Sequence, residues 1–298
     1  MNGREFLVYC ILCLAWGLHY VVIKIGVGVL PPMFYGALRM TLLAAILSPF
    51  LRWRPGTMRT VIAAAVFLGG VNYGFLFSGL SLATASAGAI AYQLYIPFAT
   101  LLAAVFLKES IGLKRIIGIS CALSGVIIIA LGYEKAPGAA DGNVLIGFGL
   151  VACCALCEAT GSIFVKLAKG FKPHELLAWA AIVGACVLWS LTLLFETGQG
   201  EAFIEGDKSV VIAVILYSVV GASIIGHGSF YWLLQNVPVF IVSSSALMVT
   251  VSGVLFGVLL LGEPLTLNFI VGGTIALISV GFVIWRNADA KKESSRET

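Results

Sequence analysis

Long apolar runs separated by short polar segments make up almost the whole chain. A hydrocarbon core about 30 Å thick requires roughly 20 helical residues at about 1.5 Å rise each. Runs of about this length lie at 6–29, 33–51, 59–80, 85–107, 112–132, 143–168, 174–195, 209–234, 240–261 and 266–285. They are continuous, whereas the strands of a β-barrel alternate between apolar and polar residues. The pattern therefore predicts an all-α membrane protein with ten transmembrane helices.

The composition excludes the soluble classes of protein. Of the 298 residues, 60% are hydrophobic and 11% are charged. An ordinary soluble domain has about 45–50% apolar and about 25% charged residues. The chain has 18 basic and 14 acidic side chains, too few to cover a soluble globule of this length. A multi-pass membrane protein remains.

The distribution of Lys and Arg predicts the orientation, because cytoplasmic loops are enriched in these residues. With a cytoplasmic N-terminus, fourteen of the eighteen basic residues fall in cytoplasmic segments, and only Lys135 and Lys208 fall in outer loops. We therefore expect both termini to be cytoplasmic. The net charge of +4 then reports topology, and no nucleic-acid partner is needed to explain it.

The chain also contains an internal repeat. The segment 109–126 matches 263–280 at an offset of 154, with seven identical residues in eighteen. Earlier in each copy, Pro31 matches Pro173 at an offset of 142. The difference of 12 between the offsets (154 − 142) fits one insertion in the polar loop after the seventh run. The chain therefore contains two copies of a five-helix unit.

We assign the two copies to residues 1–135 and 136–298. Five is an odd number, so the second copy crosses the membrane in the opposite direction to the first. Inverted five-helix repeats of this kind are typical of secondary transporters, whose binding site lies near the midplane between the halves. The repeat predicts transport by alternating access.

Several short motifs of the chain resemble those of the drug/metabolite transporter superfamily, specifically its ten-helix EamA-type exporters. These motifs are Trp16-Gly17, Lys24, Pro31-Pro32, Arg39, Thr84 to Ala87, Pro97, Lys108-Glu109, Gly118, Gly262 to Leu265 and Gly272. The resemblance implies a bacterial inner-membrane exporter of metabolites, often amino acids, with an aromatic-lined cavity. The second copy departs from the pattern, since Glu158-Ala159 replaces the Trp-Gly pair.

Glu158 is the only acidic residue deep inside a predicted span. An ionisable group at a helix centre costs about 2.5–3.5 kcal/mol on insertion scales, so it usually faces a cavity or a partner. Glu158 is therefore a candidate to bind a substrate ammonium or to carry a coupled proton. The alternative is a structural pair with a Lys or His of the bundle.

His227 is a second candidate for substrate binding and proton coupling. It corresponds to Tyr73 in the first copy, and glycines interrupt both helices near this level. Paired interruptions indicate a central site, although glycines also permit close helix packing. His19 lies one turn from Trp16 on the first helix. Both are candidate substrate contacts, and a hydrogen bond to a neighbour explains the histidine equally well.

The fourth predicted helix carries Tyr92, Gln93 and Tyr95 far from either membrane interface. Aromatic faces with a few hydrogen-bonding groups suit a neutral amphipathic ligand or an ammonium. Packing filler is the alternative for each residue. We expect the same lining to include Asn72, Tyr73, Tyr231 and Ser244, with Phe77 and Trp232 as possible extensions.

Lys24 and Arg39 are the two basic residues assigned within spans on the outer side. They could attract a carboxylate at an outer gate. The alternative that we favour is snorkelling, in which a long side chain extends its charged head to the headgroups.

The sequence predicts no metal site and no cofactor. It has no HExxH, GxSxG or Walker motif, so no ATPase chemistry and no ATPase subunit are implied. Cys10/Cys13 and Cys154/Cys157 have metal-like spacing, but each pair lies on one continuous apolar run and is expected to pack. The expected partners are a small-molecule substrate and the lipid bilayer.

The leading functional hypothesis is a secondary transporter that exports amino acids, neutral or aromatic ones above all, across the bacterial cytoplasmic membrane. An exporter of another small metabolite or drug, such as a nucleoside, sugar or amphipathic cation, is the first alternative. An intramembrane enzyme that uses Glu158 and His227 as an acid–base pair, or a non-transporting scaffold, is further from the pattern.

Overall fold

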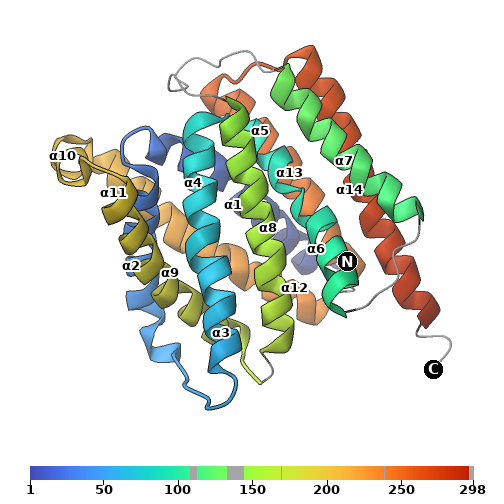
Figure 1. The fold of residues 1–298 in the computed structure, drawn as a ribbon, viewed down its shortest axis with the longest axis horizontal. Coiled ribbons are helices and arrows are strands. Elements are labelled where there is room, and N and C mark those ends of the chain that lie inside the picture. Colours follow the sequence, from blue (N-terminus) through green and yellow to red (C-terminus); the bar gives the residue numbers. More distant parts are fainter. Residues whose placement is uncertain (108–112, 133–143, 169, 238, 295–298) are drawn as a thin grey trace.

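The computed structural model describes residues 1–107, 113–132, 144–168, 170–237 and 239–294. Throughout this part of the chain the regular structure is helical (Figure 1). The helices are α1 (Gly3–Val27), α2 (Pro32–Leu47), η1 (Ser48–Phe50), α3 (Met58–Ala65), η2 (Val66–Val71), α4 (Asn72–Leu82), α5 (Ala85–Tyr92), α6 (Tyr95–Leu107), α7 (Leu113–Leu131), α8 (Val144–Leu167), α9 (Pro173–Phe195), α10 (Gln199–Glu205), α11 (Lys208–Leu216), η3 (Tyr217–Gly226), α12 (His227–Asn236), α13 (Val239–Leu261) and α14 (Leu267–Ser294).

The helices begin where the sequence supplies capping residues. The Asn2 side chain accepts a hydrogen bond from the Glu5 backbone N–H at 2.9 Å, and the Glu5 carboxylate accepts from the Asn2 N–H at 2.7 Å. This capping box satisfies donors that have no partner inside α1. Pro32 and Pro173 occupy the first positions of α2 and α9, where the missing N–H is not needed.

Among the described residues, nine helices are long and apolar enough to cross a membrane. They correspond to nine of the ten predicted spans. The remaining prediction, 112–132, coincides with α7, whose apolar part, Ile116–Leu131, is shorter. A multi-pass membrane protein is therefore confirmed, while the count of ten crossings stays a prediction. The proposed boundary between the repeats, at 135/136, lies outside the described residues.

Three predicted spans are not continuous α-helices. The spans at 59–80 and 209–234 each contain a π-helical segment, η2 and η3, in which an extra residue per turn displaces the backbone hydrogen bonds. The span at 85–107 breaks between α5 and α6. Pro97 has no N–H to donate to the Gln93 carbonyl, which accepts from the Ile96 N–H at 3.1 Å instead.

The packing follows a pairwise plan. α7 lies along α14, as the right-hand pair in Figure 1 shows, and α2 lies along α9. α1 packs against α13 and against the span α11–η3–α12. In the same way, α8 packs against α5 and α6 and against the span α3–η2–α4.

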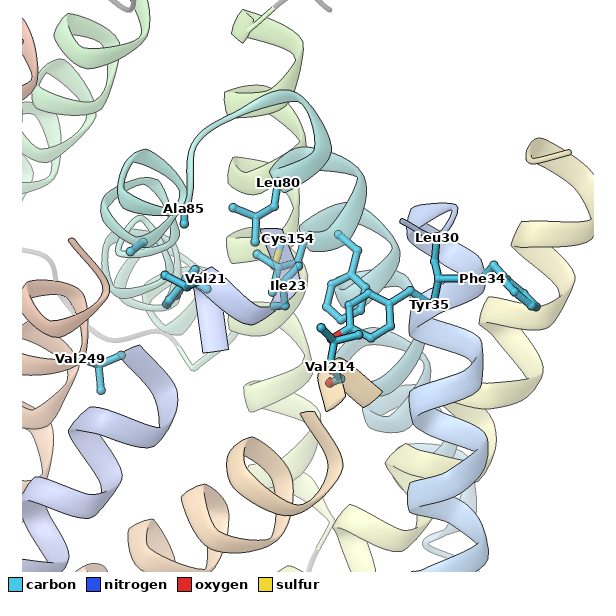
Figure 2. Close-up of a cluster of buried hydrophobic side chains, with 14 of the residues drawn as sticks. Val21, Ile23, Leu30, Phe34, Tyr35, Leu80, Ala85, Cys154, Val214 and Val249 are labelled. Atoms are coloured by element: carbon cyan, nitrogen blue, oxygen red, sulfur yellow. Dashed lines mark hydrogen bonds between the residues drawn. The ribbon is translucent and has the colours of Figure 1, made fainter. Parts of the chain in front are cut away.

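A buried apolar cluster lies between helices of the bundle (Figure 2). Val21 and Ile23 of α1 meet Tyr35 of α2, Cys154 of α8 and Val214 of α11 in it. Tyr35 is one helical turn from Arg39 on α2, so this cluster adjoins the middle of the membrane-spanning region.

Two charged side chains hold the short turn between α4 and α5, Lys24 from α1 and Glu263 from the loop between α13 and α14. Lys24 Nζ donates to the carbonyl oxygens of Leu80 at 2.8 Å and Ala83 at 2.7 Å. The Glu263 carboxylate accepts from the N–H groups of Ala85 at 2.7 Å and Ser86 at 2.8 Å. These bonds cap the C-terminus of α4 and the N-terminus of α5 with the charges that the helix dipoles favour.

Candidate substrate-binding site

Most of the predicted site residues lie near the middles of their spans, at the level of the two π-helices. Trp16 belongs to α1 and Glu158 to α8. Tyr73 follows η2 directly, at the start of α4, and His227 follows η3 directly, at the start of α12. The backbone irregularities of the two spans therefore coincide with their candidate polar residues.

Glu158 is held by an amide. The Asn72 side-chain Nδ2 donates to the Glu158 Oε2 at 2.7 Å. The Tyr92 hydroxyl also lies within reach of this carboxylate. Glu158 is only half-buried, so it keeps an accessible part at the centre of the bundle. In the described part of the chain, no Lys, Arg or His forms an ion pair with it.

Arg39 is buried to 1% exposure in the middle of α2. Its guanidinium carbon lies 4.1 Å from the centre of the Tyr73 ring, a cation–π contact. Its Nη2 donates to the Tyr73 hydroxyl at 3.2 Å and to the Ser223 Oγ at 2.9 Å. The Nε and Nη1 atoms are buried and have no hydrogen-bond partner among the described residues.

The two ionisable groups are supported by consecutive residues. Asn72 binds Glu158 and Tyr73 binds Arg39, and neighbouring Cα atoms are about 3.8 Å apart. Both ionisable groups therefore contact residues at the start of α4. They are not paired, since the ion pairs among the described residues are those of Glu5 with the N-terminus and of Arg54 with Glu175.

The π-helix η3 supplies further polar atoms. Ser218 Oγ lies 3.2 Å from His19 Nε2 and 2.6 Å from the Tyr35 hydroxyl. Ser223 Oγ, which accepts from Arg39, donates to the Ser218 carbonyl at 3.0 Å. This side-chain bond spans five residues, which is the hydrogen-bond spacing of a π-helix.

A group of aromatic rings lies beside η3 at the start of α12. Trp16 Nε1 donates to the Ala222 carbonyl at 2.9 Å, and its ring meets that of His227 edge-on at 5.2 Å. His227 Nδ1 lies 3.2 Å from the same carbonyl. The Tyr231 ring centre is 6.3 Å from that of His227. Trp16, His227 and Tyr231 are half-buried.

Tyr92 and Tyr95 complete the lining on the side of α8. The Tyr92 ring meets Tyr20 edge-on at 6.3 Å, and Tyr95 lies beside Ser162 and near Glu158. Both are half-buried. Both tyrosines thus lie on the side of the site that holds Glu158, and their part in substrate binding stays a prediction.

Two of the predicted lining residues have other contacts. The Gln93 side chain is buried and donates to the Ala246 carbonyl at 2.6 Å and to the Thr250 hydroxyl. It joins α5 to α13, so its amide N–H groups are engaged in packing. Ser244 lies 3.0 Å from the Tyr9 hydroxyl, well away in sequence from the mid-span residues of α1. The structure does not bring Ser244 together with Glu158.

The preferred interpretation of Lys24 and Arg39 as snorkelling residues is wrong. Arg39 is buried inside the bundle, and Lys24 caps the carbonyl groups of Leu80 and Ala83. Proximity to the helix end misled the prediction, because sequence position alone does not tell which way a side chain projects.

The pairings proposed for Glu158 are also not found. Its hydrogen-bond partner is Asn72, so it is not a structural pair with a Lys or His of the described chain. His227 faces the Ala222 carbonyl and the Arg39 side of the site. No hydrogen bond joins Glu158 to His227 among the described residues, and the acid–base pair of the enzyme hypothesis is not formed.

Three polar residues of the site were not predicted from the sequence, namely Tyr35, Ser218 and Ser223. The two serines are five residues apart, which is the hydrogen-bond spacing of a π-helix and not of an α-helix. Together with the flanking glycines, this spacing was the signal that could have identified them.

The arrangement offers an anion, a cation and several aromatic faces within one layer of the membrane-spanning region. Carboxylate and aromatic groups bind ammonium ions, and a guanidinium binds carboxylates. The side chains therefore suit a small organic solute better than a metal or a phosphorylated ligand.

Comparison with known proteins gives the family. The EamA-like transporter family matches residues 4–131 and 145–285. A protein of Salmonella typhimurium named "Probable amino-acid metabolite efflux pump" is 26% identical over 97% of this chain and 99% of its own length. An "Uncharacterized transporter" of Archaeoglobus fulgidus is 25% identical over 94% of this chain and 99% of its own length.

A solved crystal structure has the same fold. Its TM-score is 0.58 at 19% sequence identity, and the match covers 95% of this chain and 96% of that one. The two matched segments, the apolar helices and the mid-span polar site agree with one conclusion. The chain is a multi-pass membrane transporter and belongs to the EamA-like family of the drug/metabolite transporter superfamily.

Proposed function

We propose that this protein is a secondary exporter of amino acids, neutral or aromatic ones above all, in the cytoplasmic membrane of a bacterium. The observation that carries the proposal is the accessible Glu158 carboxylate, which Asn72 holds at mid-span with no described cationic partner. A carboxylate in this position is free to bind the ammonium of a substrate. Tyr92 and Tyr231 supply aromatic faces near this carboxylate, and Trp16 adds a further one beside His227.

The name of the Salmonella relative supports the substrate class at 26% identity. An amphipathic cation is the second candidate, because a carboxylate among aromatic rings would also bind one. A phosphorylated substrate is disfavoured, since a phosphate requires several Arg or Lys groups and Arg39 is the basic side chain described at this level.

We further propose ten spans arranged as two inverted repeats, 1–135 and 136–298, with both termini cytoplasmic. The packing supports this arrangement, because α1 contacts α13 and the η3 span as α8 contacts α5, α6 and the η2 span. The family match in two separate segments also supports it. Two such repeats, rocking about a central site, would expose that site to each side in turn.

In this mechanism Glu158 and His227 are the candidate carriers of a coupled proton. Glu158 can exchange its interaction with a substrate ammonium for a proton, which would link the two fluxes. His227, bonded at Nδ1 to a carbonyl, retains its other ring nitrogen for the site. Lys24 and Arg39 remain candidates for a gate. This role requires that their hydrogen bonds in this conformation break during the transport cycle.

Flux measurements on the purified protein in proteoliposomes test the proposal. The panel contains labelled neutral and aromatic amino acids, a nucleoside, a sugar and an amphipathic amine, each with and without an imposed pH gradient. We expect accumulation of at least one amino acid above that of protein-free vesicles. Transport of only the amine, nucleoside or sugar would contradict the amino-acid assignment.

A further inference from the structure

The Arg39 guanidinium is an incompletely satisfied cation in the interior of the bundle. Two of its five N–H groups belong to Nη2, which contacts Tyr73 and Ser223. The other three belong to Nε and Nη1, which are buried without a partner in the described chain. Burying a charge that lacks hydrogen bonds is unfavourable, so these donors indicate a ligand that is bound during part of the transport cycle.

The surroundings of Arg39 favour an anionic ligand. The ionisable groups nearest to it are His19, Tyr35, Tyr73 and His227, and no acidic side chain is within ion-pair distance among the described residues. Glu158 is engaged by Asn72. A carboxylate brought in by the substrate would supply the missing acceptor.

Arg39 and Glu158 both contact the start of α4. Asn72 and Tyr73 are adjacent in sequence and contact Glu158 and Arg39 respectively. An α-amino acid carries its ammonium and its carboxylate on the same carbon atom. It therefore carries the two groups that Glu158 and Arg39 would bind, an ammonium for the carboxylate and a carboxylate for the guanidinium.

We propose that Arg39 binds the carboxylate of the transported amino acid while Glu158 binds its ammonium, so that the site selects zwitterions. This inference rests on the proposed function and adds the specificity-determining residue to it. In the conformation described, the half-buried Tyr73 ring covers the guanidinium. Access of the carboxylate therefore requires Tyr73 to change its side-chain rotamer.

The first test uses the unmodified protein. In proteoliposomes, transport of the amino acid with the largest flux in the panel is compared with that of its amide, which keeps the ammonium and lacks the carboxylate. Loss of a charge-assisted hydrogen-bonding partner lowers binding affinity by a factor of about ten to a hundred. We therefore expect the amide to be transported at least about tenfold less efficiently than the amino acid. Equal transport of the amide would overturn the proposal while leaving amino-acid export intact.

The second test assigns the discrimination to Arg39. We expect Arg39→Gln to lower amino-acid flux and to bring the ratio of amino acid to amide within about twofold, and Arg39→Lys to retain part of the ratio. Arg54→Gln is the matched control, because Arg54 pairs with Glu175 at the end of the span and not at the site. A folded Arg39→Gln protein that keeps the wild-type ratio would refute the role of Arg39. If that variant does not fold, the comparison on the unmodified protein decides alone.

Discussion

Two helix crossings at the centre of the molecule occupy corresponding places in the two proposed repeats and carry different chemistry. Where α1 crosses the η3 span, the Trp16 indole packs on Gly226 and donates to the Ala222 carbonyl. Where α8 crosses the η2 span, Glu158 accepts from Asn72. The repeat offsets relate Trp16 to Glu158 (16 + 142 = 158) and Asn72 to Gly226 (72 + 154 = 226).

The comparison teaches that the packing plan and the chemistry of the site vary separately. One crossing combines a large ring with a residue that has no side chain, and the other combines a carboxylate with an amide. Both combinations of residues allow two helices to pack closely where they cross. A duplicated scaffold can therefore present an aromatic face from one half and a charge from the other.

The largest effect is expected at the charged crossing. Glu158→Gln keeps the shape of the side chain and its bond with Asn72 but removes the charge. Removing the charge takes away one partner of the proposed buried pair between Glu158 and the substrate ammonium, a loss of about 2–5 kcal/mol, so we expect amino-acid export to fall at least about thirtyfold. Initial rates in proteoliposomes measure it. Glu158→Asp is the control for the charge, and wild-type export by the glutamine variant would refute the role of Glu158.

The amide of the same crossing should have the next largest effect. Asn72→Ala removes the hydrogen bond that orients the Glu158 carboxylate, and a bond to a charged group contributes about 1.5–3 kcal/mol. We expect the apparent substrate affinity to weaken about tenfold or more while the protein stays folded. Asn236→Ala is the matched control, since the exposed Asn236 amide donates to the Trp232 carbonyl within its own helix. Equal affinities of the two variants would contradict the positioning role.

The aromatic crossing is expected to be sensitive to one added methyl group at Gly226. A Cβ at Gly226 would collide with the Trp16 indole, whereas a Cβ at Gly228 would meet nothing within 4 Å. We expect Gly226→Ala to lower the free energy of unfolding by about 1–3 kcal/mol. Gly228→Ala should be neutral or slightly stabilising, because Ala favours helix over Gly by about 0.5–1 kcal/mol. Unfolding in detergent compares the pair, and equal losses in both would contradict the close contact.

The smallest effect concerns the indole N–H. Trp16→Phe keeps an aromatic face but loses the hydrogen bond to the Ala222 carbonyl, a net contribution of about 0.5–1.5 kcal/mol. We expect a change of two- to about tenfold in KM with little change in kcat. The exposed Trp53 provides the control variant, Trp53→Phe. A loss in Trp16→Phe as large as that in Glu158→Gln would reverse the ranking of the two crossings.

The membrane-spanning elements could be read from the sequence because each apolar run is long enough to span a bilayer. The interruptions could not. The glycines near residues 70 and 226 indicated irregular backbone, but glycine spacing does not distinguish a π-helix from close packing. The break at Gln93 depended on Pro97, which a hydropathy pattern alone ignores.

The candidate site was predictable where one residue type is rare. Glu158 stood out because acidic groups are unfavourable at mid-span, and its neighbours Asn72 and Tyr92 were among the predicted lining residues. Arg39 was misjudged because only the tertiary structure shows it turned inward. Gln93 has the contacts expected of its packing alternative, because its amide bonds to a neighbouring helix.

The turn at Thr84 has a consequence for the mechanics of the protein. Glu263 accepts hydrogen bonds at the N-terminus of α5, and at its C-terminus Gln93 donates to α13. Both sets of hydrogen bonds join α5, a helix of the proposed first repeat, to the second repeat. α5 is therefore hydrogen-bonded to the second copy at both of its ends, so in the proposed rocking motion we expect α5 to move with the second copy and not with the first.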